Sequence, residues 1–432
     1  MRHYFRSLLL FAALSLRAQT TPEAPGDSSL EKFHPLKAPG AAGLLLREGD
    51  RVAICGDSIT EQKMYSRIME TYLTVAVPEL KITARQCGWS GETAPGFLGR
   101  MTNDALQFHP TLATTCYGMN DHGYRPYDAG IGDRYRASST AIVEAFKTAG
   151  ARVIQGSPGC VGRIPPWCQF KEAGVDALNL NLCELRNIDV GIAEKEQAGF
   201  ADVFWPMLTA DRDGRAKYGP DYALAGKDGV HPGWAGHLVM AYAFLKSMGL
   251  DGNLGVFTVD LGANRAKASA GHELVSFTDG AMTVKSARYP FCAPGTNVVD
   301  DNSIRSGMSL VPFNQELNRL TLVAKNGKAG SYKVTWGTGS KTYSADDLAR
   351  GVNLAADFDQ NPFSEAFARV DAAVAAKQAY ETRQIKELFH GPEGRRDLPA
   401  TTALTEEVRA PLAAAIHEAF KPVTHTIKIE AM

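Results

Sequence analysis

Cysteine is scarce in this sequence, with seven in 432 residues. Small disulfide-stapled scaffolds carry a far higher share, so a hydrophobic core must hold this fold instead. An odd number also leaves at least one thiol unpaired within the chain. Three cysteines lie close together in a loop-rich stretch, where we expect that one pair can close a bridge: Cys160, Cys168 and Cys183. Three others adjoin apolar runs and are predicted to be buried: Cys55, Cys87 and Cys116.

The sequence also lacks an excess of charge of either sign. Lys and Arg number 46 and Asp and Glu 47, a formal net charge of −1. No global field therefore attracts nucleic acid or an anionic membrane, and we predict neither as a partner. Cys-x-x-Cys and His-Glu-x-x-His motifs are absent and the ten histidines are scattered. We accordingly predict no metal site and no cofactor.

Long apolar runs are missing except for a short one at the start. Arg2 and Arg6 precede an apolar stretch at 7–16, and Ala18 follows as a small residue at a cleavage point. This run is about half of the roughly 20 residues that span a bilayer. The pattern predicts a secretory signal peptide at 1–18 and a secreted or periplasmic protein without stable membrane insertion. An uncleaved anchor or a cytosolic tail is the alternative.

Strand-like and helix-like segments then alternate. Residues 19–43 are rich in Pro, Gly, Ala and Ser and indicate a linker. Between 44 and 250, apolar strands near 51–55, 80–86, 111–117 and 152–155 are separated by helical patterns. This alternation predicts an α/β domain with a parallel sheet covered by helices on both faces.

The sequence pattern changes after residue 250. Short strand-like segments separated by Gly and Asn turns predict a small antiparallel β domain at 251–345. Residues 346–432 predict two helices, one running from Asn361 to His390 and one from Thr405 to Phe420, and a final strand at 424–429.

Ser58 directly follows the first buried strand, within Gly56-Asp57-Ser58. Ligands gather beyond the carboxyl ends of parallel strands, so this position favours a nucleophile. Capping of the following helix is the structural alternative. Near the end of the same domain, the spacing in Asp228-Gly229-Val230-His231-Pro232 allows the Asp228 carboxylate to reach one imidazole nitrogen and leaves the other free to accept the serine proton. A surface ion pair is the alternative for this motif.

An acyl-transfer site also needs donors for the developing oxyanion. Gly91 follows the second strand and exposes its N–H, and Asn120 follows the third strand and offers a side-chain amide. Both positions also suit ordinary turn residues. All these clusters fall, however, at one predicted edge of one sheet.

The four motifs resemble the ordered blocks of the SGNH, or GDSL-type, hydrolases: Gly56-Asp57-Ser58, Ser90-Gly91-Glu92-Thr93, Gly118-Met119-Asn120-Asp121, and Asp228 with His231. The resemblance covers about 51–249 and implies a flavodoxin-like three-layer α/β/α domain and a serine esterase that needs no cofactor. It makes Ser58 the nucleophile, His231 the general base and Asp228 its orienter. Ser58 N–H, Gly91 N–H and Asn120 become the oxyanion donors.

Two departures from common patterns qualify the resemblance. Gln86 stands where family members often place an asparagine, which puts a supporting hydrogen bond in question. Separately, the sequence has no Gly-x-Ser-x-Gly elbow, which argues against the α/β-hydrolase fold.

The substrate implied is a small-molecule or polysaccharide ester. Exported family members with an added β domain resemble carbohydrate esterases, so we expect removal of acetyl groups from carbohydrate. A short-chain arylesterase or a lipase is the alternative within the class. An inactive carbohydrate-binding or scaffold protein is the alternative outside it.

Overall fold

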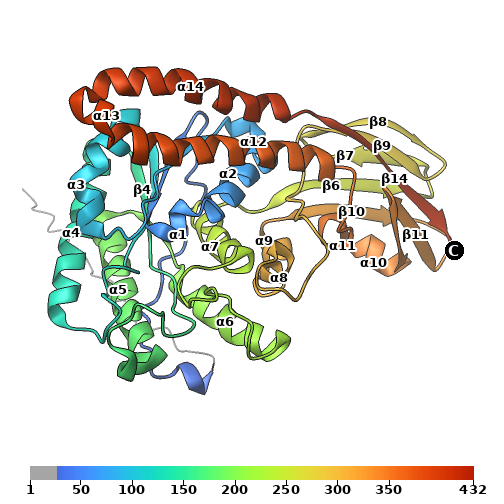
Figure 1. The fold of residues 1–432 in the computed structure, drawn as a ribbon. Coiled ribbons are helices and arrows are strands. Elements are labelled where there is room, and N and C mark those ends of the chain that lie inside the picture. Colours follow the sequence, from blue (N-terminus) through green and yellow to red (C-terminus); the bar gives the residue numbers. More distant parts are fainter. Residues whose placement is uncertain (1–26) are drawn as a thin grey trace, which may run out of the picture.

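A parallel five-stranded sheet lies at the centre of the first half of the chain (Figure 1). The computed structural model describes residues 27–432, so the predicted signal peptide lies outside the described residues. The strand order is β2-β1-β3-β4-β5 and every neighbouring pair is parallel, as in flavodoxin-like folds. The strands are β1 (Arg51–Gly56), β2 (Thr83–Gln86), β3 (Leu112–Cys116), β4 (Arg152–Gly156) and β5 (Gly199–Ala201). The predicted α/β fold class is confirmed.

Helices cover both faces of this sheet because its strands are apolar on both sides. Along β1, Val52 and Ile54 contribute to one core, and Ala53 and Cys55 contribute to another on the opposite face. Helices on the first face are α2 (Tyr65–Ala76), α6 (Phe204–Tyr218) and α7 (Trp234–Ser247). Those on the second are α3 (Ala94–Asp104), α4 (Ala129–Thr148) and α5 (Gly174–Glu196).

Two further sheets follow α7. One has the order β13-β10-β6-β7 and the other β12-β11-β14-β9-β8. Their strands are β6 (Asn253–Asp260), β7 (Arg265–Ala268), β8 (His272–Thr278), β9 (Ala281–Ser286), β10 (Arg319–Lys325), β11 (Ser331–Trp336), β12 (Gly339–Ser344), β13 (Val352–Asn353) and β14 (Val423–Ala431). Short connecting helices are α8 (Ile304–Met308), α9 (Phe313–Glu316), α10 (Ala345–Arg350) and α11 (Leu354–Asp357).

These sheets are antiparallel as expected, except that β6 and β10 run parallel. Phe257 on β6 and His425 on β14 contact each other edge to face, with ring centroids 5.8 Å apart. Trp336 on β11 donates its indole N–H to His425 at 3.0 Å. Strand β14 is the predicted final strand, and it lies in the middle of its sheet between β9 and β11.

The C-terminal helices lie against the first domain. They are α12 (Ser364–Arg383), α13 (Pro392–Arg396) and α14 (Leu398–Ala419), and a π-helical turn at Gln384–Phe389 directly follows α12. Helix α12 packs along α2 and against β2, and Figure 1 shows α12 and α14 running side by side. The long helix expected to reach His390 is therefore an α-helix as far as Arg383 and changes its winding there.

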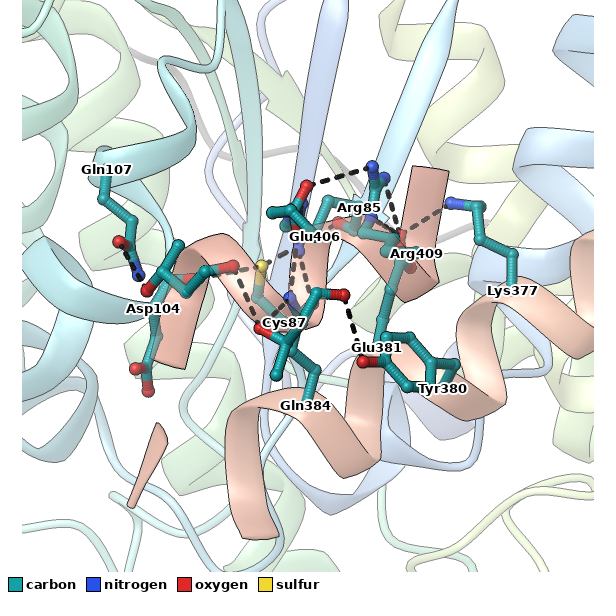
Figure 2. A network of polar contacts seen from close by, with 12 residues as sticks. Arg85, Cys87, Asp104, Gln107, Lys377, Tyr380, Glu381, Gln384, Glu406 and Arg409 are labelled. Atoms are coloured by element: carbon teal, nitrogen blue, oxygen red, sulfur yellow. Dashed lines mark hydrogen bonds and ion pairs between the residues drawn. The ribbon is translucent and has the colours of Figure 1, made fainter. Parts of the chain in front are cut away.

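Side chains from α12 and α14 bond to the free edge of β2. An edge strand leaves a row of unpaired N–H and C=O groups. Here the N–H of Gln86 donates to Glu381 at 3.0 Å, and the carbonyl of Ala84 accepts from Lys377 at 2.5 Å and from Arg409 at 3.1 Å. Figure 2 shows the surrounding charged network. The helices thus supply the hydrogen bonds that a sixth strand would make.

All seven cysteines, each within the described residues, are free and buried. The expectation of a bridge among Cys160, Cys168 and Cys183 is therefore wrong. All three belong to one hydrophobic core instead, where the Cys168 thiol donates to the carbonyl oxygen of Tyr124 at 3.2 Å. The predicted burial of Cys55, Cys87 and Cys116 is confirmed.

Candidate active site

Ser58 lies at the turn between β1 and the short helix α1 (Ser58–Glu61). Asp57 caps this helix by accepting a hydrogen bond from the N–H of Ile59 at 2.9 Å. A Cβ on Gly56 would lie 2.0 Å from the Thr60 hydroxyl oxygen, so only glycine fits this close turn. The turn leaves Ser58 partly exposed at the carboxyl end of β1.

A continuous hydrogen-bonded chain joins Ser58 to His231 and Asp228. The Ser58 hydroxyl oxygen lies 2.8 Å from His231 Nε2, and His231 Nδ1 lies 2.7 Å from Asp228 Oδ2. An ionised carboxylate accepts only, so Nδ1 carries the proton and Nε2 is free to accept from Ser58. The structure brings these three residues together across 173 positions of sequence.

The loop before α7 fixes the Asp228 carboxylate. Its second oxygen, Oδ1, accepts from the N–H groups of Val230 and His231, each at 2.9 Å. Burial acts to raise the pKa of Asp228, but hydrogen bonds from the N–H groups of His231 and Val230 and from the His231 ring outweigh it, so this pKa lies below its usual value. The carboxylate therefore stays ionised and holds the imidazole in one tautomer.

Gly91 and Asn120 lie in the loops that follow β2 and β3. Gly91 has a φ of +73°, in the left-handed region that glycine adopts without strain. The Asn120 amide donates to the carbonyl oxygen of Glu92 at 2.9 Å, and its Nδ2 lies 3.5 Å from Asp57 Oδ2. Tyr124 donates its hydroxyl to Asn120 Oδ1 at 3.2 Å, which fixes the orientation of the amide. Asn120 thus connects the Gly91 loop to the residue before Ser58.

Gln86 supports the Ser58 turn despite its departure from the family pattern. Its side-chain amide donates to the carbonyl oxygen of Thr60 at 2.7 Å. In turn, Thr382 on α12 donates to Gln86 Oε1 at 3.2 Å. The Gln86 side chain, longer than that of asparagine, therefore hydrogen-bonds α1, the helix that begins at Ser58.

Buried carboxyl groups lie beneath the site. Complete burial, together with the charges of Asp121 and Glu92, raises the pKa of Asp57 to about 7 against the hydrogen bond from the N–H of Ile59. Burial likewise raises the pKa of Asp121 to about 6, although the N–H groups of Ala94 and Gly118 lower it. Both carboxyl groups therefore keep their protons to a higher pH than an exposed aspartate does.

Aromatic side chains flank the site, and the sequence alone did not point to them. The indole of Trp167 is 45% exposed and its ring centroid lies 5.9 Å from that of His231. Tyr124 contacts Trp167 edge to face at 5.7 Å. Trp167 belongs to a loop without strand or helix pattern, so no periodicity marks it as a site residue.

A hollow of about 430 Å³ opens beside His231 and Asp228. Its lining is mostly polar or glycine and includes Lys227 and, from the segment after the first domain, Asp301 and Asn302. Asp301 also accepts from the N–H of Ala223 at 3.0 Å, which ties the two parts of the chain together. The sequence alone does not show that residues 226–233 and 301–302 line one hollow, because the two segments lie about 70 residues apart in the chain.

Within residues 27–432, no three His, Cys, Asp or Glu side chains gather in a way that suits a metal ion. Over that same range, no helix combines the length and apolar character needed to cross a membrane.

Comparisons with known proteins agree with this geometry. Residues 54–239 match the model of the GDSL-like Lipase/Acylhydrolase family. An acetylxylan esterase of Geobacillus stearothermophilus is 25% identical over 230 residues, which cover 49% of this chain and 96% of that enzyme. A solved structure of a gut microbial diltiazem-metabolizing enzyme superposes with a TM-score of 0.71 over 91% of this chain and all of that chain, at 22% identity. This last likeness is one of fold, and it extends well beyond the first domain. Residues 54–239 thus form an SGNH, or GDSL-like, hydrolase domain, and the protein is an ester hydrolase.

Proposed function

We propose that the protein hydrolyses short-chain acyl esters through Ser58, His231 and Asp228, and that its substrate is an acetylated carbohydrate. The observation that carries this proposal is the pair of hydrogen bonds, 2.8 Å and 2.7 Å long, from Ser58 through His231 to Asp228. This order of nucleophile, base and carboxylate is the one that activates a serine for attack on a carbonyl.

The reaction has two steps. Ser58 Oγ forms a bond to the ester carbonyl carbon while His231 Nε2 takes the hydroxyl proton, and the resulting oxyanion is stabilised by Gly91 N–H, Ser58 N–H and the Asn120 amide. Collapse expels the alcohol, which receives the proton from His231, and leaves an acyl-enzyme. Water, deprotonated by His231, then releases the acid and restores Ser58.

The surroundings of the site support a carbohydrate on the alcohol side. Trp167 presents a partly exposed indole face near His231, and the apolar face of a sugar ring stacks well on such a surface. The adjoining hollow is lined in part by Lys227, Asp301 and Asn302, whose side chains can hydrogen-bond hydroxyl groups. The similarity to an acetylxylan esterase points the same way.

Turnover by the purified chain tests this proposal. We expect release of acetate from acetylated xylo-oligosaccharides and from p-nitrophenyl acetate, with rates that fall as the acyl chain lengthens. Fast hydrolysis of long-chain esters without deacetylation of oligosaccharides would instead indicate a lipase or arylesterase. Absence of all ester turnover, together with binding of oligosaccharides, would favour a binding protein.

We further propose that residues 1–18 direct export. Expression of the full sequence in a secreting host, followed by N-terminal sequencing of the exported product, tests this; a product that retains Met1 would contradict it.

A further inference from the structure

The loop that carries Gly91 is held by a carboxylate on the nucleophile's own helix. Glu61 ends α1, three residues after Ser58. Its Oε2 accepts from the N–H of Ser90 at 2.5 Å and from the Ser90 hydroxyl at 2.7 Å. Ser90 directly precedes Gly91, so the position of Glu61 sets the direction of the next N–H along the chain.

Glu61 is held in turn by the C-terminal segment. Lys386, in the π-helical turn Gln384–Phe389, lies with Nζ 2.8 Å from Glu61 Oε1 and 2.9 Å from Oε2. The pair is partly buried, with side chains 29% and 19% exposed, so water screens it less than a surface pair. Burial acts to raise the pKa of Glu61, but the bonds from Lys386 and Ser90 outweigh it and lower that pKa, so the carboxylate stays ionised.

The same segment also contacts the residue before Ser90. The Lys386 ammonium lies 5.4 Å from the ring centroid of Trp89, and the His390 ring meets Trp89 edge to face at 4.9 Å. His390 Nε2 lies 2.9 Å from Asp104 at the end of α3. Lys386 and His390 thus both contact Trp89, which lies in the loop that carries Gly91.

Docking of the C-terminal helices does not depend on Lys386. A separate buried network fixes them to β2: Arg85 on β2 donates to Gln384 at 2.8 Å, and Lys377 on α12 donates to the carbonyl oxygen of Ala84 at 2.5 Å. Figure 2 shows Arg85, Gln384 and Lys377 in this network. Buried and fully bonded groups of this kind determine whether the helices stay in place. The partly exposed Lys386 is therefore available for another role.

We propose that Lys386 is a positioning residue for the ester hydrolysis: through Glu61 and Ser90 it holds the Gly91 N–H in the direction that the oxyanion requires. This inference rests on the proposed function. It gives the C-terminal segment, which lies outside the GDSL-like domain, a part in that domain's chemistry. A donor misplaced by about 1 Å costs on the order of 10- to 100-fold in rate.

The experiment compares Lys386→Met, Lys386→Arg and Glu61→Gln with wild type on p-nitrophenyl acetate. We expect Lys386→Met and Glu61→Gln to lower kcat about 10-fold or more with little change in KM, and Lys386→Arg to restore most of the rate. Affinity for a boronic acid, which forms a tetrahedral adduct on Ser58, should fall in parallel. Lys246→Met is the matched control, because it removes another partly exposed pair, Lys246–Glu316, also 2.9 Å long.

The outcomes separate this inference from the proposed function. Wild-type protein without ester turnover, or a Ser58→Ala variant that retains it, would overturn the proposed function and the role of Lys386 with it. Turnover that depends on Ser58 but is unchanged in Lys386→Met, with unchanged boronate affinity, would overturn the role of Lys386 alone. A loss of fold in one variant leaves the other as the test, since Glu61→Gln keeps every other contact of the C-terminal segment.

Discussion

The side-chain amide of Asn120 donates a 2.9 Å hydrogen bond to the main-chain carbonyl oxygen of Glu92, the residue that follows Gly91. One of the two amide hydrogens is thereby used within the protein, and the other faces Asp57 Oδ2 over a long 3.5 Å contact, which a substrate oxyanion can replace. The two proposed oxyanion donors that lie outside the Ser58 turn are therefore coupled to each other before substrate arrives.

Replacement of Asn120 by Ala tests this pair. We expect a loss of about 3 kcal/mol of transition-state stabilisation, seen as a lower kcat with a small change in KM, because an oxyanion donor acts after attack. Steady-state kinetics on p-nitrophenyl acetate measure both constants. A rise in KM alone would instead make Asn120 a substrate-binding residue.

Ser58→Ala and His231→Ala should each lower turnover by at least about a thousandfold with an unchanged circular dichroism spectrum. The double variant should lose little more than either single one, because the two side chains act as one unit. Additive losses would mean that they act independently. A fluorophosphonate adduct located at Ser58 by mass spectrometry is the complementary measurement.

Asp228→Asn should reduce kcat by roughly 10⁴-fold. The amide can donate a hydrogen bond to Nδ1, which stabilises the tautomer that presents a proton, rather than a lone pair, to Ser58. The variant should keep wild-type stability near pH 7 within about 1 kcal/mol, since the amide oxygen can still accept from the N–H groups of Val230 and His231. Activity close to wild type would exclude Asp228 as the orienting group.

Asp57 makes stability depend on pH. Its pKa in the folded state, about 7, lies above the ordinary value, so the folded protein holds a proton that the unfolded chain releases. This contribution is favourable at low pH and is lost as the pH rises from about 4 to about 7. Asp57→Asn keeps a capping oxygen for Ile59 and removes the titration.

The difference between wild type and Asp57→Asn in urea midpoint should therefore shift in favour of the variant as the pH rises over that range. Because Asp121 remains in both proteins, the comparison isolates the titration of Asp57 together with its coupling to Asp121. A constant difference between pH 5 and pH 8 would contradict a raised pKa for Asp57.

Trp167→Ala should raise KM for acetylated oligosaccharides about fivefold, which corresponds to about 1 kcal/mol of lost aromatic contact. Turnover of ethyl acetate, whose alcohol is too small to cover the indole, should change little. Equal effects on both substrates would mean that Trp167 supports His231 rather than the substrate.

Much of the first domain was predictable because its buried parallel strands are short apolar runs, and such runs are visible in one sequence. Ser58, Asp228 and His231 were predictable because Asp228 and His231 share one tight loop and Ser58 follows the first strand. The parallel pairing of β6 with β10 was not, since strand direction leaves no mark on side-chain alternation.

The roles of the charged residues in the C-terminal helices could not be predicted from the sequence either. Lys377 and Glu381 are both essentially fully buried, yet a Lys and a Glu four residues apart are typical of a solvated helix face. Their partners on β2 lie about 290 positions earlier, and only the fold brings the two together. Lys386 and Glu61, 325 positions apart, were missed for the same reason.

The central place of β14 in its sheet sets the order in which the protein can be completed during synthesis. Strands β8, β9, β11 and β12 leave the ribosome before it, yet β9 and β11 have no direct pairing and are bridged only by β14. The free edge of β2 likewise lacks hydrogen-bond partners until α12 and α14 are synthesised, about 300 residues later. Contacts of such long separation form slowly, and an open edge exposed meanwhile can pair with another chain. The nascent protein therefore needs its final strand and helices before the edges of these sheets are protected.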